Sequence, residues 1–212
     1  MEGTTGTSVY AMRAITTAED RAAVKRLVEE RNRWLATRLI AGPSMTEAGT
    51  TVPEESLTVG LFEDDQPVGC LRLQRQPRHE AHWAAEPAEP SLLLSFAHST
   101  PGRASDRIGQ LMSIWAQDFA ARLGMASVRC EIPGSPAVLS EGRRPGRLLR
   151  HLRDRCGWQI KHHGRTPAGR PVALLQLPAL ARPDLAPLIL CRVPLTIRDA
   201  ARAPHTSIGS QP

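Results

Sequence analysis

The chain has 212 residues, a length that suits one domain and is long enough to bury a sizeable core. Its apolar content of 41% and charged content of 23% are typical of a globular protein in water. The formal net charge of +6 suggests nucleic acid or a phosphate ligand as a partner. Only Lys25 and Lys161 are lysines among the 27 basic residues, however, a bias that also accompanies a GC-rich genome. The charge alone therefore names no partner.

The cysteines and the chain ends favour a cytoplasmic protein. No Cys-x-x-Cys pair and no zinc-ligand spacing occurs among Cys70, Cys130, Cys156 and Cys191. The first three lie in apolar contexts, which predicts core residues in a reducing compartment. The first eight residues lack the basic and apolar regions of a signal peptide. The late apolar run Leu185–Leu195 is about half the length that a bilayer requires.

The first half of the chain predicts a strand, a helix and a hairpin. The strand is expected at Tyr10–Ile15, and capping signals at Thr16 and Thr17 precede a helix over Ala18–Leu39. Alternating apolar residues predict a strand at Leu57–Glu63, a turn at Asp64–Pro67 and a returning strand at Val68–Gln74. The intervening segments Ala41–Ser56 and Arg75–Pro90, the latter around Trp83, are expected to be loops. Long ordered loops of this kind are often functional, although disorder is the alternative.

The central segment is the one that suggests a ligand. The apolar run Leu92–Ala97 leads through the polar loop Thr100–Arg107 into a helix that we expect to start at Ile108 and to end at Gly124. A strand at Ala126–Glu131 follows. Free backbone N–H groups and the helix dipole favour a phosphate at the start of such a helix.

The last part predicts a helix over Pro145–Arg155, ended by Gly157, and a hairpin of Gln159–His163 with Pro171–Leu177. The domain is expected to span residues 10–178, with flexible termini at 1–9 and 179–212. The predicted fold class is α+β, a mixed α/β arrangement in which helices flank a central, mostly antiparallel sheet.

This element order resembles the GCN5-related N-acetyltransferase (GNAT) superfamily. In that family a fourth strand, a pyrophosphate-binding loop and a long helix form the acyl-CoA site. The loop motif Gln/Arg-x-x-Gly-x-Gly/Ala corresponds here to Ala104–Gly109, which keeps only the last glycine and carries Arg107 in place of the first. The family's helix-ending Gly-Phe/Trp corresponds to Gly157-Trp158.

The resemblance implies a cleft for acyl-CoA, with acetyl-CoA as the expected co-substrate and no metal, between the fourth and fifth strands. A backbone N–H near Phe96 or Ala97 would polarise the thioester carbonyl. Backbone N–H groups would bind the pyrophosphate, and Arg103 and Arg107 would add charge-assisted bonds. The residues expected to supply those N–H groups are Asp106, Arg107, Ile108, Gly109 and Gln110. Asp106 and Ser105 are also candidate N-caps of the helix.

Acid and base groups are harder to assign. Many family members use a tyrosine four residues before the helix-ending glycine as general acid, but that position is Arg153, and the only tyrosine is Tyr10. His151 is a catalytic candidate on the same helix as Cys156, although a structural role is the alternative for both. Glu131 is a candidate base at a strand end, where a solvated carboxylate is the alternative. The loop around Trp83 adds three weaker candidates, His79, Glu80 and Glu86. His162 and His163 are adjacent on a strand and so point to opposite faces, which argues against a shared metal site.

The leading hypothesis is therefore an acyl-CoA-dependent N-acyltransferase that acts by direct attack of an amine. A non-catalytic acyl-CoA sensor or partner-binding module on the same fold is the alternative. A nucleic-acid-binding function is disfavoured because no helix-turn-helix spacing, aromatic strand motif or basic stripe is visible. The expected partners are acyl-CoA and an amine acceptor held by the two long loops, with no membrane; a homodimer stays open.

Overall fold

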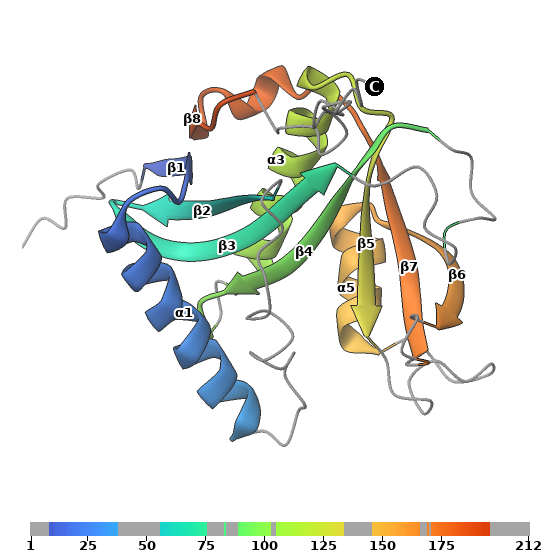
Figure 1. Cartoon of the computed structure of the whole chain (residues 1–212), viewed down its shortest axis with the longest axis horizontal. Helices are drawn as coiled ribbons and strands as arrows, with labels where there is room; N and C mark the ends of the chain where they lie inside the picture. Colours follow the sequence, from blue (N-terminus) through green and yellow to red (C-terminus); the bar gives the residue numbers. More distant parts are fainter. Residues whose placement is uncertain are drawn as a thin grey trace, which may run out of the picture.

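The computed structural model describes residues 9–37, 56–75, 83, 89–102, 105–133, 146–165, 169 and 171–195. These segments form one sheet with helices on both faces (Figure 1). The strands are β1 (Tyr10–Ala14), β2 (Leu57–Glu63), β3 (Gln66–Arg75), β4 (Ser91–Ser99), β5 (Ser127–Pro133), β6 (Gln159–Arg165), β7 (Pro171–Pro178) and β8 (Ile189–Arg192). The helices are α1 (Ala18–Ala36), α3 (Ser105–Arg122) and α5 (Arg147–Cys156), with a short 3-10 helix η2 (Pro183–Leu185).

The eight-stranded sheet has the order β6-β7-β5-β4-β3-β2-β1-β8. Its neighbours are antiparallel except for the pairs β4–β5 and β1–β8, which are parallel. The predicted α+β class with a mostly antiparallel sheet is confirmed. The predicted hairpin of β2 and β3 is also confirmed, and its two turn residues, Asp64 and Asp65, have the positive φ values that a tight hairpin favours.

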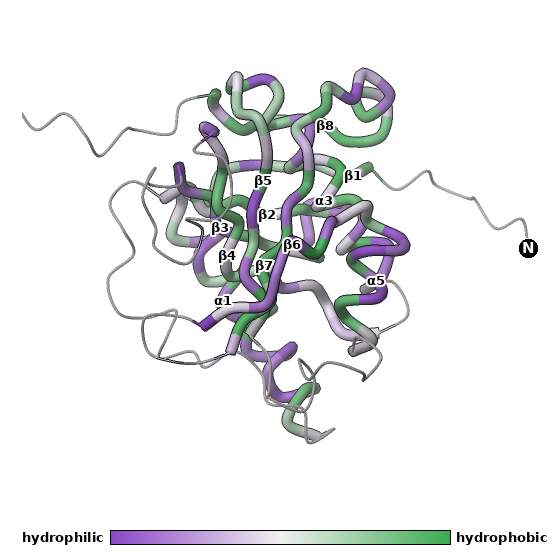
Figure 2. The backbone as a smooth tube through the Cα atoms, turned by 90° about the vertical axis from the view of Figure 1, so that its right-hand side faces the viewer, coloured by the Kyte–Doolittle hydropathy of each residue, from purple (hydrophilic) through white to green (hydrophobic). Residues whose placement is uncertain are grey.

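The helices divide between the two faces of the sheet. Figure 2 shows α1 on one side of the strands and α3 with α5 on the other. The larger core lies on the α3 side, where Trp115 and Phe119 stack with ring centroids 4.8 Å apart. A smaller core lies beneath α1 and joins Val24, Leu27 and Val28 to Cys70 of β3. The two faces of the sheet therefore have separate hydrophobic cores, made of different side chains.

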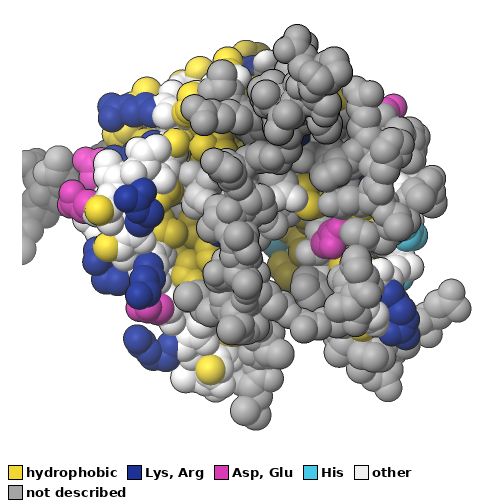
Figure 3. Space-filling view, viewed as in Figure 1, with side chains coloured by type: hydrophobic (Ala, Val, Ile, Leu, Met, Phe, Trp, Pro, Cys, Tyr) yellow, Lys and Arg dark blue, Asp and Glu magenta, His cyan; other side chains and the backbone are white. Residues whose placement is uncertain are grey.

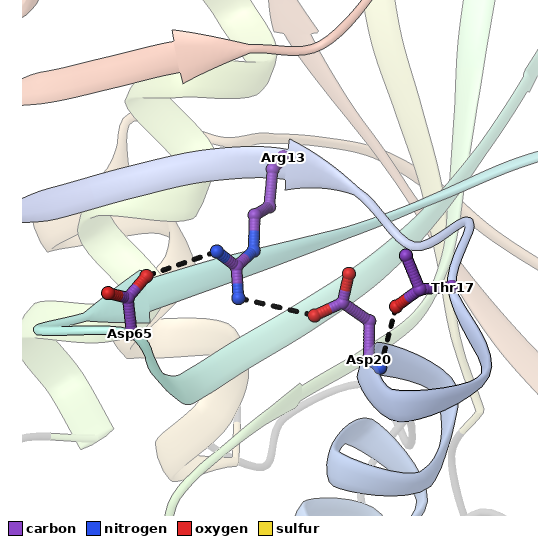
Figure 4. Close-up of polar contacts among 4 residues, drawn as sticks. All are labelled: Arg13, Thr17, Asp20 and Asp65. Carbon is purple, nitrogen blue, oxygen red and sulfur yellow. Dashed lines mark hydrogen bonds and ion pairs between the residues drawn. The ribbon is translucent and has the colours of Figure 1, made fainter.

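Polar contacts fix the start of α1 against the sheet (Figure 4). The Thr17 hydroxyl accepts a hydrogen bond of 3.0 Å from the backbone N–H of Asp20, so Thr17 is the N-cap. Arg13 of β1 forms ion pairs of 3.2 Å with Asp20 and 3.1 Å with Asp65, and its guanidinium carbon lies 3.6 Å from the Phe62 ring centroid. One side chain therefore links strand, helix and hairpin turn.

The expected end of the domain at Pro178 is wrong. The chain continues through η2 into β8, which pairs in parallel with β1 (Figure 2). Leu185, Ile189 and Val193 are buried in the larger core. The prolines and small residues of this segment give no local strand pattern. The strand forms because it pairs with β1, which lies at the other end of the sequence. Residues 196–212, like residues 1–8, lie outside the described part.

The start of α3 differs from the prediction, whereas the start of α5 lies close to it. α3 begins at Ser105 rather than at the expected Ile108, so Asp106 lies in the first helical turn and is not the N-cap. α5 begins at Arg147, close to the expected Pro145, and ends at Cys156, where Gly157 with a φ of +77° forms a left-handed C-cap. Within the described segments, no helix combines the length and the apolar character needed to cross a bilayer.

Candidate functional site

The two central parallel strands separate within their length. β4 and β5 pair from Ser91↔Ser127 as far as Leu94↔Cys130, and beyond that pair the two strands diverge (Figure 1). β4 is irregular at the same point, because Arg72 of β3 pairs with Ser95 while Cys70 pairs with His98. Phe96 and Ala97 together therefore lie opposite the single residue Leu71, which defines a β-bulge.

The bulge holds a strained residue. Phe96 has a φ of +53°, a left-handed conformation that is unfavourable for a residue with a side chain. Its ring packs against His98, with centroids 4.5 Å apart, and against the small core beneath α1. Ala97 is exposed. Strain at one point of an otherwise regular strand is a feature that clusters at functional sites.

The N-terminus of α3 supplies a possible anion-binding end. The N–H groups of Ser105, Asp106 and Arg107 lie in the first turn of α3 and have no intrahelical acceptor, because the first intrahelical hydrogen bond is donated by the fourth helical residue. This narrows the expected set, because the N–H groups of Ile108, Gly109 and Gln110 come after those three. Asp106, Arg107 and Gln110 are exposed, whereas the Ile108 side chain is 1% exposed and belongs to the core. Arg107 lies over the Tyr10 ring at 5.5 Å, and the expected Arg103 lies outside the described residues.

Gly109 lies where α3 meets α5. A Cβ atom added at Gly109 would come within 3.9 Å of His151 Nε2, an ordinary contact distance, so packing does not require glycine there. His151 Nε2 also lies 3.5 Å from the Cys156 thiol, whose pKa is raised by burial. The Trp158 indole donates to the Ser113 hydroxyl at 3.1 Å, which in turn donates to the Gly109 carbonyl at 2.9 Å. The sequence placed His151 and Cys156 on one helix, but no local signal indicated their contact with the first turns of α3.

Glu131 is held by Trp83. The Trp83 indole N–H donates a hydrogen bond of 3.0 Å to a carboxylate oxygen of Glu131, and the ring is buried against Val172 and Leu174 of β7. The guanidinium of Arg129 lies 4.7 Å from the same ring. Glu131 faces away from its core neighbour Cys130, as the strand alternation predicted. Trp83 was missed as a core residue because it lies in a proline-broken segment with no strand or helix periodicity.

The helix α5 carries no tyrosine for acid catalysis. Arg153 is exposed and forms an ion pair of 2.6 Å with Asp154, which lowers the pKa of that carboxyl. Tyr10 is on β1 and donates a hydrogen bond of 2.7 Å to Glu63, and burial raises the pKa of its phenol. His79, Glu80 and Glu86 lie outside the described residues. In the part of the chain that the structure covers, no cluster of three or more His, Cys, Asp or Glu side chains is placed to hold a metal ion.

Comparison with known proteins identifies the fold. No family profile matches the chain, and no characterised protein matches it by sequence. Among solved structures, it is similar to the aminoglycoside 6'-N-acetyltransferase from Enterococcus faecium, with a TM-score of 0.57, 13% identity, and coverage of 83% of this chain and 99% of that one.

Two further structures extend the likeness. FeeM, an N-acyl amino acid synthase from uncultured soil microbes, matches with a TM-score of 0.53 and 11% identity over 87% of this chain and 96% of its own. The NatC complex bound to Gag peptide and CoA matches with a TM-score of 0.51 and 12% identity over 81% of this chain and 99% of that one. The chain therefore has the GNAT fold, as its element order predicted.

Proposed function

We propose that this protein is an N-acyltransferase that transfers an acyl group from acyl-CoA, with acetyl-CoA as the expected donor, to an amine. The observation that carries the proposal is the divergence of β4 from β5 directly beside the bulge at Phe96 and Ala97. Two of the structures with this fold are named as transferases or synthases that acylate nitrogen, and a third holds CoA. In the GNAT superfamily that the chain resembles, acyl-CoA lies between the fourth and fifth strands, which correspond here to β4 and β5.

In the proposed reaction the neutral amine attacks the thioester carbonyl. A C–N bond forms, the C–S bond breaks, the CoA thiolate leaves, and the nitrogen loses its proton to solvent or to the thiolate. The backbone N–H of Phe96 or Ala97 would stabilise the negative charge that develops on the carbonyl oxygen. The first-turn N–H groups of α3, with Arg103 and Arg107, would bind the CoA diphosphate.

The two catalytic candidates take different places in this proposal. His151 contacts the turn that follows the phosphate-binding end of α3, so binding the CoA arm suits it better than donating a proton at the bulge. Glu131 accepts a hydrogen bond from Trp83, so we assign it to holding that ring before any role as a base. The thiolate can leave without an acid, since a thiol pKa is only moderately high.

The test is the stability of the protein with and without acetyl-CoA. If the dissociation constant is about one hundredth of the ligand concentration, binding adds about 2.7 kcal/mol to the free energy of unfolding. For a chain of this size that is a rise in Tm of roughly 5–10 °C. An unchanged Tm of monodisperse protein at millimolar acetyl-CoA would refute the proposal.

A non-catalytic acyl-CoA sensor is the second candidate, and the exposed Arg153 at the position of the expected tyrosine favours it. Mass spectrometry separates the two functions. Protein that binds acetyl-CoA but forms no acylated product across a panel of primary amines would be a sensor, whereas any enzyme-dependent amide would establish transfer.

A further inference from the structure

A half-buried arginine lies beside the bulge on the face of the sheet that α1 covers. Arg72 of β3 pairs with Ser95, the residue directly before the bulge. Its neighbours Leu71 and Leu73 enter the core on the α3 side, and Cys70 enters the core beneath α1, so Arg72 faces the α1 side by strand alternation. The guanidinium carbon lies 5.2 Å from the Phe96 ring centroid.

Among the described residues, this arginine lacks an anionic partner. No carboxylate of the described residues forms an ion pair with Arg72, and its Nε atom is buried without a hydrogen-bond partner. Buried polar groups are nearly always hydrogen-bonded, and a desolvated cation without an anion is costly. A ligand that offers an anionic acceptor to Arg72 would remove this energetic cost.

His98 contacts the same aromatic ring, and Arg31 of α1 lies near His98. His98 is 5% exposed and its ring contacts Phe96, with centroids 4.5 Å apart. Its Nε2 finds no hydrogen-bond partner in the part of the chain that the structure describes. Burial and the nearby Arg31 guanidinium lower the pKa of His98 to about 4, so the ring is neutral at neutral pH. Arg31 follows Val28 by one turn on the sheet-facing side of α1. Lys and Arg side chains lie on the molecular surface over α1, with Asp and Glu side chains among them (Figure 3).

We infer that Arg72 binds the carboxylate of the acceptor, so that the substrate class is an amine that also carries a carboxylate, as an amino acid does. The inference rests on the proposed function. The planar guanidinium matches a carboxylate with two parallel hydrogen bonds, and a neutral His98 adds a hydrogen bond without a second full charge. A carboxylate held there leaves the amine of the same molecule beside the bulge, where the C–N bond forms as the C–S bond breaks. Arg72 is in this sense a specificity-determining residue.

The experiment measures amide formation from acetyl-CoA by mass spectrometry. Each of the twenty amino acids is paired with its carboxamide, which keeps the amine and removes the negative charge, and O-phosphoethanolamine is included as a phosphate-bearing amine. We expect kcat/KM for the best amino acid to exceed that of its carboxamide by about 10-fold or more, since a hydrogen-bonded charge is lost.

Substitutions then test the assigned side chain. Arg72→Gln is expected to raise KM for the amino acid by about 10- to 100-fold while leaving KM for its carboxamide unchanged. Arg72→Lys keeps the positive charge but cannot form two parallel hydrogen bonds to a carboxylate, so a smaller rise in KM for the amino acid is expected. This variant replaces Arg72→Gln in the test if the glutamine variant does not fold. Arg26→Gln is the matched control, because it removes the same charge from the exposed side of α1.

The outcomes separate this inference from the function on which it rests. If acetyl-CoA raises Tm and only carboxamides or O-phosphoethanolamine are acylated, the acceptor class is wrong while the transferase function stands. Equal KM values for the amino acid in the wild type and in both Arg72 variants would overturn the assignment of Arg72. If acetyl-CoA leaves Tm unchanged, the proposed function itself fails, and the inference fails with it.

Discussion

Replacing Gly109 by alanine separates a structural role of this glycine from a role in binding. The new Cβ would lie 3.9 Å from His151 Nε2, a normal contact, so the protein has room for it. Glycine in a helix interior is less favourable than alanine by about 0.5–1 kcal/mol. Gly109→Ala should therefore raise the free energy of unfolding by about that amount, which corresponds to an increase in Tm of about 1–4 °C.

The same substitution should leave the Kd for acetyl-CoA unchanged. The N–H group of Gly109 comes after the free N–H groups of the first turn, and the added methyl group would lie against His151. The assay is a titration of wild type and variant with acetyl-CoA, by calorimetry for Kd and by thermal unfolding for Tm. A variant that is more stable and binds acetyl-CoA as tightly as the wild type is the expected result.

The control is Gly124→Ala, at the other end of the same helix. Gly124 has a φ of +68° with no atom within 4 Å of an added Cβ, so alanine there is strained without a clash. It should lower the free energy of unfolding by about 1 kcal/mol and leave Kd for acetyl-CoA unchanged. The reasoning is refuted if Gly109→Ala lowers Tm in the absence of ligand, or if it raises Kd, which would show that the phosphate-binding backbone extends to Gly109.

Three more substitutions test the described contacts. Trp83→Phe keeps a ring but deletes the donor to Glu131, so urea unfolding should show a loss of about 1–3 kcal/mol; a change within error would contradict the packing of Trp83 on β7. Arg13→Met should cost about 1 kcal/mol, less at high salt, because it removes the ion pairs to Asp20 and Asp65; a loss independent of salt would point to packing on Phe62 instead. The pKa of His98 is about 4 in the folded protein, below its unfolded value of about 6.5. The free energy of unfolding should therefore be highest above pH 6.5 and fall by up to about 3 kcal/mol as the pH is lowered toward 4. His98→Gln should flatten that pH dependence of the free energy of unfolding, and an unchanged slope would show that other groups cause it.

Much of the fold was predictable because its elements have strong local signals. The hairpin of β2 and β3 follows from alternation around a turn, and α3 follows from an apolar stripe that ends at Gly124. β8 was not predictable, since its four residues are stabilised by pairing with β1 and by the burial of Ile189, both of which depend on residues far away in the sequence. The burial of Trp83 could not be predicted for the same reason, because its partners are on β5 and β7.

The amino-acid sequence by itself determined the order of strands and helices, and with it the expectation of an acyl-CoA site at the junction of β4 and α3. Periodicity, caps and turn residues are local properties, so they can be read without knowing the partners. Only the tertiary structure decided where β4 leaves β5, that His151 lies against Gly109, and that Arg72 and His98 meet at Phe96. Each of these depends on strand register and on helix packing, which are fixed by contacts between distant residues.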